Sequence, residues 1–293
     1  MGFLTASCQL LLHAREQRGV DFSRTLTLGR QELHMKVGAL RELAMAHGIG
    51  TEEQLRRLDG SKGYAEPFLE LLGAQRIESI DASDYEQATI IHDLNEPVPA
   101  SLHGRFTCIV DGGTVEHVFH FPNAIKSCMD MLEIGGHYIG ITPANNHMGH
   151  GFYQFSPELY YRLFAEENGF EVRTMLVKSA SDWYEVADPK ALRERTELVN
   201  AAPVTLFIIA RKAKDAGAFH TPQQSDYVTV WKAQDPGQQQ AAEGGDQVLQ
   251  LARKVLPTGM KTWLKRALSF TRKRVTVEGL GTVDTRHFKR VEL

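Results

Sequence analysis

The segment from residue 106 to residue 143 restricts the fold of this chain more than any other part of the sequence. The apolar run FTCIV at residues 106–110 predicts a buried strand, and the polar turn Asp111-Gly112-Gly113 ends it. Residues 124–132 have a helical pattern, and a second apolar run follows at residues 137–142. A strand, a helix and a strand in this order predict a β-α-β unit, whose two strands are parallel.

The same alternation extends to both sides of this unit. Because strands that alternate with helices form mainly parallel sheets, we predict an α/β fold: a seven-stranded, mainly parallel Rossmann-like sheet with helices on both faces. The 293 residues, 42% of them hydrophobic, are enough to build its core. Further strands are predicted at residues 25–28, 76–80, 88–92, 170–177 and 204–210, and further helices at residues 32–46, 52–58, 67–72, 156–168 and 189–199.

Composition divides the chain into three parts. Residues 1–212 are predicted to be the α/β domain, with an N-terminal helix and a helical insertion near residues 31–75. Gln, Gly, Ala and Pro dominate residues 213–246, which is typical of a linker. Residues 247–293 are predicted to be a basic, amphipathic helical extension.

The extension is basic because residues 247–277 contain eight Lys and Arg residues and no acidic residue. Such a segment either lies on an anionic membrane surface or packs its apolar face on the main domain. We predict no specific nucleic acid partner, and the sequence does not indicate an oligomeric state. The chain has no apolar run long enough to span a membrane and no signal-peptide pattern, so we expect a cytoplasmic protein whose basic segment could contact the inner face of the membrane. The three cysteines, Cys8, Cys108 and Cys128, lack metal-ligand spacing and are expected to be buried thiols.

Polar residues follow several of the predicted strands. In open α/β sheets, ligands bind beyond the carboxyl ends of the strands, so these residues are candidates for one binding site. A carboxylate there can accept hydrogen bonds from ribose hydroxyls or from an adenine amino group. The alternative is that Asp and Gly end strands because both favour turns. The candidates are Gly29, Arg30, Gln31, Asp81, Asp93, Leu94, Asp111, Gly112 and Gly113.

Four segments in this order, IESIDAS, IIHDLNEPVP, FTCIVDGGTVEHVF and MLEIGGHYIGITP, resemble the class I S-adenosylmethionine-dependent methyltransferases across residues 25–212. The resemblance implies that S-adenosylmethionine is the cofactor. It places Asp81 at the ribose, Asp93 and Leu94 beside the adenine, and Asp111 to Gly113 in the cofactor wall. The family's glycine-rich loop after the first strand is reduced here to Gly29, so either Arg30 or Gln31 replaces its contacts or the pocket binds a different ligand.

The loop after residue 143 is the predicted acceptor wall, because it combines polar, aromatic and histidine side chains. Methyl transfer to a hydroxyl needs a base, for which histidine is suited. We predict His117 and His150 as bases, Glu116 as an orienting partner and Tyr153 as a positioning group. The expected acceptor is a small molecule or a glycan, methylated on oxygen or nitrogen, which suggests polysaccharide biosynthesis. The alternative is that each histidine is a surface or capping residue.

No catalytic metal is predicted. His117 and His120, and likewise His147 and His150, are three residues apart, but Pro122 and Gly149 interrupt the helices that would bring each pair together. Two other functions stay open: a non-catalytic binding protein that has lost the cofactor pocket, and another nucleotide-using enzyme on the same fold.

Overall fold

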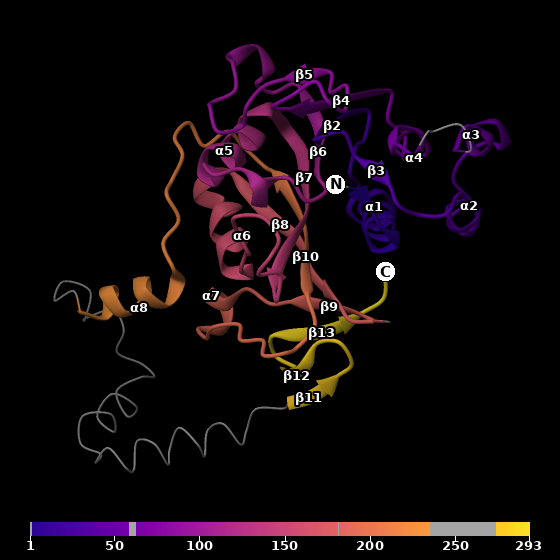
Figure 1. Cartoon of the computed structure of the whole chain (residues 1–293). Coiled ribbons are helices and arrows are strands. Elements are labelled where there is room, and N and C mark those ends of the chain that lie inside the picture. The colour runs from indigo at the N-terminus through magenta and orange to yellow at the C-terminus, as the bar shows by residue number, and fades with distance from the viewer. Residues whose placement is uncertain (1, 59–62, 181, 235–273) are drawn as a thin grey trace.

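A mixed β-sheet forms the centre of the molecule in the computed structural model, which describes residues 2–58, 63–180, 182–234 and 274–293 (Figure 1). Within those residues the sheet has nine strands, in the order β13-β9-β8-β10-β7-β6-β2-β4-β5. Its strands are β2 (Arg24–Leu28), β4 (Arg76–Asp81), β5 (Ile90–Ile91), β6 (Phe106–Asp111), β7 (Leu132–Asn145), β8 (Phe170–Lys178), β9 (Trp183–Val186), β10 (Val204–Lys212) and β13 (Phe288–Val291).

Five neighbouring strands, β5, β4, β2, β6 and β7, are parallel. Numbered by their appearance in this sheet, they follow the order 3-2-1-4-5, which is the order at the centre of a doubly wound Rossmann sheet. The predicted Rossmann-like architecture is therefore confirmed for this half of the sheet. The β-α-β unit that dominates the sequence lies at the centre of the nine-stranded sheet. There β6 pairs with β7, and helix α5 (Phe121–Met131) connects the two strands.

The other half of the sheet corrects the prediction of seven mainly parallel strands. β10 lies between β7 and β8 and is antiparallel to both, and β9 and β13 extend the sheet by two further antiparallel pairs. All seven predicted strands exist, but β9 and β13 were not predicted. Both are only four residues long: β9 buries three of its residues but is too short for a clear pattern, and β13 exposes Lys289 and Arg290.

Helices cover both faces of the sheet, as predicted. In Figure 1, α5 and α6 (Pro157–Leu163) lie on one face and α1 (Thr5–Arg18) on the other. α6 begins as the sequence indicates, because the side chain of Ser156 accepts a hydrogen bond from the backbone N–H of Leu159. Alternate residues of β6 enter different cores: Ile109 packs with the α5 and α6 side, whereas Cys108 and Val110 pack with the α1 side.

The predicted helical insertion contains α2 (Val37–Ala46), α3 (Glu52–Arg57) and α4 (Glu66–Leu71), which lie beyond α1 in Figure 1. It begins with the short strand β3 (Glu32–Leu33), which pairs with β1 (Gly2–Phe3). On the other side of the sheet, helix α7 (Pro189–Leu192) is shorter than the predicted helix at residues 189–199, because Arg193 adopts a left-handed conformation. The three cysteines are free and buried, as predicted, and burial raises the pKa of Cys8 to about 12.

The C-terminal part contains helices and strands that were not predicted, although residues 213–224 have no regular structure, as a linker would. The predicted linker contains helix α8 (Ser225–Gln234). The predicted helical extension ends in strands: β11 (Arg274–Val277) pairs with β12 (Gly281–Asp284), and β13 joins the main sheet. Most of the basic run of residues 247–277 lies outside the described residues. In the described part of the chain, none of the helices has the length and the apolar composition needed to cross a bilayer.

Candidate functional site

The register of the parallel strands brings several predicted residues to one edge of the sheet. Leu28 on β2 is opposite both Ile80 on β4 and Asp111 on β6. Gly29 follows directly, and its N–H donates to the carbonyl of Ile80 at 2.8 Å. The next residue of β4, Asp81, pairs with β5, so the ends of four parallel strands meet here.

Asp111 is an internal anchor of this edge. Its side chain is completely buried; one carboxylate oxygen accepts from the N–H of Thr114 at 2.8 Å and the other from the hydroxyl of Tyr138 at 2.8 Å. Burial raises its pKa. The hydroxyl of Thr114 donates to the carbonyl of Leu28 at 2.7 Å, which ties the turn to β2. Asp111 therefore fixes the turn at Gly112 and Gly113 and does not itself face solvent.

Arg30 and Gln31 are held by the protein's own groups. The guanidinium of Arg30 pairs with Glu66 of α4 at 2.7 Å and lies over the ring of Tyr64. The amide nitrogen of Gln31 donates to the carbonyl of Leu28 at 2.5 Å, while its Oε1 is buried and has no hydrogen-bond partner in the described residues. Because a Cβ at Gly112 would collide with that oxygen, Gln31 and Gly112 lie in close contact at the end of β2.

A cavity of about 190 Å³ adjoins these residues, between the β2–β4 strands and α4. It is smaller than the pockets of about 300 Å³ or more that usually hold drug-sized ligands. The residues around it are Thr27, Arg30, Gln31, Ala65, Glu66, Leu69, Ile77, Glu78, Ser79, Gln87 and Thr89.

Asp81 and Asp93 carry the carboxylates of this edge that reach solvent. Each accepts a hydrogen bond from the backbone two residues ahead, at 3.1 Å from Ser83 and 2.9 Å from Asn95. The bonds from Asn95 hold the pKa of Asp93 below its usual value. The side chain of Leu94, in contrast, is buried in the core. Both aspartates therefore stabilise turns, as the alternative reading expected, while their charge stays at the sheet edge.

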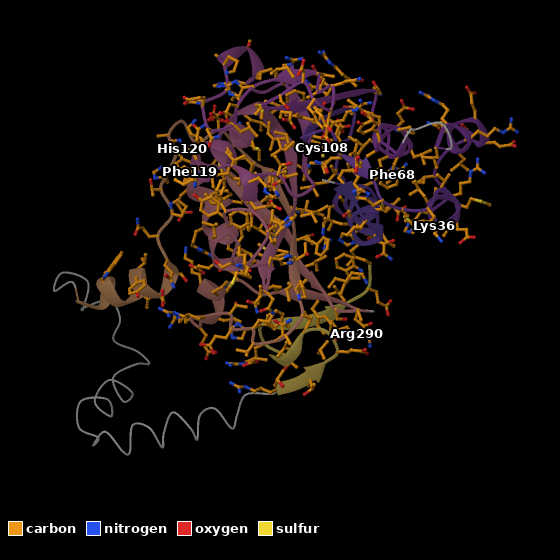
Figure 2. The ribbon with its side chains drawn as sticks, in the orientation of Figure 1. Lys36, Phe68, Cys108, Phe119, His120 and Arg290 are labelled. Atoms are coloured by element: carbon orange, nitrogen blue, oxygen red, sulfur yellow. The ribbon has the colours of Figure 1, made fainter. Side chains whose placement is uncertain are left out.

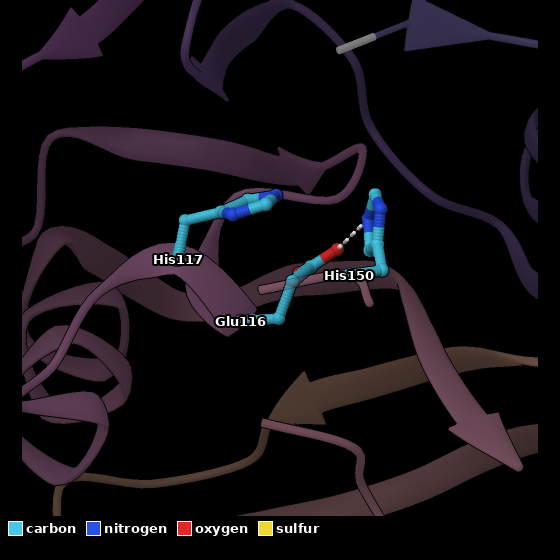
Figure 3. A group of neighbouring side chains, drawn as sticks. All are labelled: Glu116, His117 and His150. Atoms are coloured by element: carbon cyan, nitrogen blue, oxygen red, sulfur yellow. Dashed lines mark ion pairs between the residues drawn. The ribbon is translucent and has the colours of Figure 1, made fainter. Parts of the chain in front are cut away.

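Glu116, His117 and His150 form a compact group of reactive side chains (Figure 3). Glu116 and His117 belong to a 3₁₀ turn, Val115–His117, which directly follows the turn anchored by Asp111. His150 comes from the loop after β7. The distance between Glu116 Oε1 and His150 Nε2 is 3.3 Å, and the two imidazole rings meet edge to face with 5.0 Å between their centroids. The three predicted catalytic groups therefore point toward one another.

The loop after β7 is fixed directly on Glu116. The carbonyl of Glu116 accepts from the N–H of Phe152 at 2.7 Å. Gly151 has φ +71°, and a Cβ there would lie 2.8 Å from the same carbonyl, so only glycine fits this approach. Tyr153, the predicted positioning group, donates its hydroxyl to the carbonyl of Phe119 at 2.6 Å and thereby joins the two loops.

The charge state of the cluster follows from its burial. The side chain of Glu116 is 1% exposed, and burial together with the nearby Asp111 raises its pKa to about 8. Its Oε2 has no hydrogen-bond partner in the described residues. Burial and His150 lower the pKa of His117, so this imidazole is neutral at pH 7. Glu116 therefore keeps its proton to a higher pH than an ordinary glutamate does.

Exposed apolar side chains beside the cluster were not predicted. Phe119 and Phe152 are 62% and 67% exposed, with their rings edge to face at 5.9 Å, and Met148 is 93% exposed. Figure 2 shows Phe119 and His120 next to each other close to α5. The sequence signal is weak, because VEHVFHF and GHGFYQF also contain the buried Phe121 and Phe155. His147 was predicted only as part of the loop; its ring lies 5.9 Å from that of His150, and its Nε2 is buried without a described partner.

A second cavity, of about 580 Å³, lies away from this edge, between α6, α7 and the start of α8. Some of its charged residues are paired: Arg162 with Glu158 and with Asp188 of the neighbouring turn, and Arg195 with Asp226. We assign this cavity no role.

Neither a family model nor a curated protein matches the sequence. Among solved structures, the branched-chain polyamine synthase of Thermus thermophilus, in complex with N4-aminopropylspermidine and 5′-methylthioadenosine, is 14% identical with a TM-score of 0.38. The match covers 77% of this chain and 60% of the synthase, so this chain spans less than two thirds of that protein.

Two further structures are similar at the same level. The 1,6-didemethyltoxoflavin-N1-methyltransferase of Burkholderia thailandensis, with bound S-adenosylhomocysteine, is 12% identical with a TM-score of 0.37, over 71% of this chain and 77% of that one. TehB of Haemophilus influenzae is 12% identical with a TM-score of 0.36, over 70% and 61%. Because all three TM-scores are below 0.5, the fold assignment rests on the strand order and register described above.

Proposed function

We propose that this protein transfers a methyl group from S-adenosylmethionine to an oxygen or nitrogen of an acceptor bound over Glu116, His117 and His150. The observation that carries the proposal is the 3.3 Å approach of Glu116 Oε1 to His150 Nε2, in a turn that continues the carboxyl end of β6. In doubly wound sheets, this edge is where nucleotide cofactors bind. The cluster therefore combines a base with the expected cofactor edge.

The residues at the edge fit a cofactor with ribose hydroxyls and an amino group. Asp81 would accept from the ribose hydroxyls, and Asp93 would accept from the adenine amino group. The buried, unpartnered Oε1 of Gln31 is an acceptor for the ammonium of the methionine part. When bound, the cofactor supplies a methyl group on a positively charged sulfur.

Glu116 and His150 form a proton-accepting pair. Above the pKa of Glu116, about 8, its ionised carboxylate accepts the Nε2–H of His150 and so leaves Nδ1 free to take the proton of the acceptor. The imidazolium that forms is then stabilised by the carboxylate. His117, neutral at pH 7, borders the same space without adding a positive charge.

The surface beside the cluster supports a proposal for the acceptor class. Phe119 and Phe152 expose an aromatic pair there, and a sugar ring offers both a C–H face to pack on such rings and hydroxyls to methylate. We therefore propose a glycan-type acceptor, as in polysaccharide biosynthesis, with the basic residues 247–277 supporting work near an anionic membrane.

Calorimetry with the full chain tests cofactor binding. We expect S-adenosylmethionine and S-adenosylhomocysteine to bind, Asp81→Ala to weaken both, and Asp84→Ala, an exposed aspartate in the same loop, to leave both unchanged. His150→Ala should keep binding but lose methyl transfer. Absence of heat with either ligand at millimolar concentration refutes the proposal.

One observation favours a second candidate, a non-catalytic protein that keeps the fold. The side chain of Gln31 is 2% exposed and fills the end of β2 against Gly112, where the glycine-rich loop of the methyltransferases would approach its cofactor. Mass spectrometry of the purified protein separates the two, because a functional pocket often retains cofactor or product. A different small molecule retained there would favour the second candidate.

A further inference from the structure

We propose that Glu116, His117 and His150 bind a divalent transition-metal ion, with Zn²⁺ as the best-matched ion. The three side chains supply two imidazole nitrogens and one carboxylate oxygen. This donor set is the one found in His₂Glu catalytic zinc sites, and imidazole nitrogen disfavours Mg²⁺ and Ca²⁺, which prefer oxygen. The site was not expected from the sequence, because the two histidines are 33 positions apart.

The spacing of the donor atoms suits such an ion. One potential ligand atom from each residue lies within 4.8 Å of the other two. Two ligands of a tetrahedral Zn²⁺ with bonds near 2.0–2.1 Å are separated by about 3.3 Å, which is the distance between Glu116 Oε1 and His150 Nε2. His117 is exposed, so a rotation of its side chain can close the remaining gap. Figure 3 shows all three groups facing a common space.

The buried carboxyl group of Glu116 gives an independent reason for a cation. The residue is 99% buried, its Oε2 has no hydrogen-bond partner in the described residues, and its Oε1 is directed at His150. A buried carboxylate oxygen without a hydrogen-bond partner is costly unless it is paired or coordinates a metal. An ion held with the two imidazoles would satisfy it.

A second group of similar composition shows the contrast. Glu194, Asp284 and His287 also bring potential ligands together, but Arg286 pairs there with Glu194 at 2.9 Å and with Asp284 at 2.7 Å. A guanidinium therefore already supplies the positive charge in that group. Glu116, in contrast, is paired with His150, whose imidazole carries a positive charge only when it is protonated.

The coordination sphere would be open on one side. Both histidines are exposed, whereas Glu116 closes the site from the core. Three protein ligands and an open position are typical of catalytic zinc sites, in which water or substrate takes the fourth position. The ion and the transferable proton would compete for the same pair of groups, so ion-bound and proton-accepting states are alternatives of one site.

Titration of the full chain with Zn²⁺, after removal of metal by a chelator and without S-adenosylmethionine, tests the inference. We expect one ion per chain at this site, and a loss of affinity of more than about tenfold in Glu116→Gln and in His150→Ala. His120→Ala is the matched control, because His120 is close in sequence and exposed but outside the group; its affinity should equal that of the unchanged protein. Circular dichroism establishes that each variant is folded.

Co²⁺ in place of Zn²⁺ gives a second readout, since its visible absorption depends on the ligands and should change in His117→Ala. Equal Zn²⁺ affinity in the protein and in all three ligand variants, or no binding at all, overturns the inference. Because the titration contains no methyl donor, its failure leaves the proposed methyl transfer standing, and a failure of cofactor binding leaves the metal site standing.

Discussion

At the residue scale, the environment of Glu116 disfavours its charged form. This residue is a buried carboxylic acid beside a second buried acid, Asp111, and one of its oxygens is unpartnered. Residues that bind or react are often less stable in place than their replacements would be. Replacing Glu116 should therefore increase the free energy of unfolding.

Replacing Glu116 by Gln should stabilise the protein at alkaline pH. The folded-state pKa of about 8 is above the ordinary value of 4.5, so the folded protein keeps a proton that the unfolded chain releases. The stability of the unchanged protein is then lost as pH rises from 4.5 to 8, and Glu116→Gln lacks this loss. We expect a gain on the order of 2 kcal/mol in the free energy of unfolding near pH 8.

Urea unfolding measures this difference. Near pH 4.5, where the unfolded chain also holds much of its proton, the gain should nearly vanish. A variant that is equally or less stable than the unchanged protein at both pH values would show that Glu116 is already well compensated.

At the scale of elements, most strands of the main sheet could be predicted from the sequence, but the direction of some side chains could not. All seven predicted strands exist, and β6, which is buried along its whole length, shows the clearest signal because continuous burial leaves a continuous apolar run. β9 and β13 were not predicted because they are short and because β13 is partly charged. Asp111 was expected at the cofactor wall, yet it shares the strand face of Ile109 and points into the core on the α5 side.

The residues of the candidate site could be predicted from the sequence, but their contact could not. Glu116 and His117 were identified from their place after a strand end, and His150 from its loop. Their meeting depends on Gly151 and on hydrogen bonds to the carbonyl of Glu116, which no pattern of side chains reveals. The burial of Gln31 was equally hidden, because it depends on the packing of Gln31 against Gly112.

The strand β7 carries a buried histidine that should make the protein sensitive to acid. Burial, with help from Arg211 and Arg173, lowers the pKa of His137 to about 4 from an ordinary 6.5. The unfolded chain therefore takes up a proton that the folded protein refuses, and stability falls as pH drops from 6.5 to about 4.

His137→Phe removes this proton uptake and keeps an aromatic ring. When the pH is lowered from about 7.5 to about 5, the free energy of unfolding of the variant should rise by about 1–2 kcal/mol relative to that of the unchanged protein. Urea unfolding at both pH values measures this change. His103→Phe, at an exposed position, is the control and should show no such gain. Parallel pH dependence in all three proteins would argue against the buried neutral histidine.

At the scale of the whole molecule, the last strand joins the end of the chain to the main sheet. β13 pairs with β9, and Phe288 is 3% exposed within the core on the α5 and α6 side. Strand β13 is thus part of the main sheet.

Substitutions on β13 should show this directly. Phe288→Ala should cost about 3–4 kcal/mol, as large-to-small changes in cores do. Arg290→Ala, two residues away, removes a largely exposed ion pair with Asp182 and should cost less than about 1 kcal/mol. Thermal or urea unfolding compares the two, and equal, small losses would mean that β13 contributes little to the fold.

The close approach of Gly151 to Glu116 has a consequence for finding relatives of this protein. Because no other residue fits at that point, a chain with the same cluster must have the Glu-His pair after its strand and a His-Gly pair in the later loop. Either pair alone is common, but the two together form a fingerprint. A related sequence that keeps Glu116 and His117 but carries a bulky residue at position 151 would retain the fold without the site.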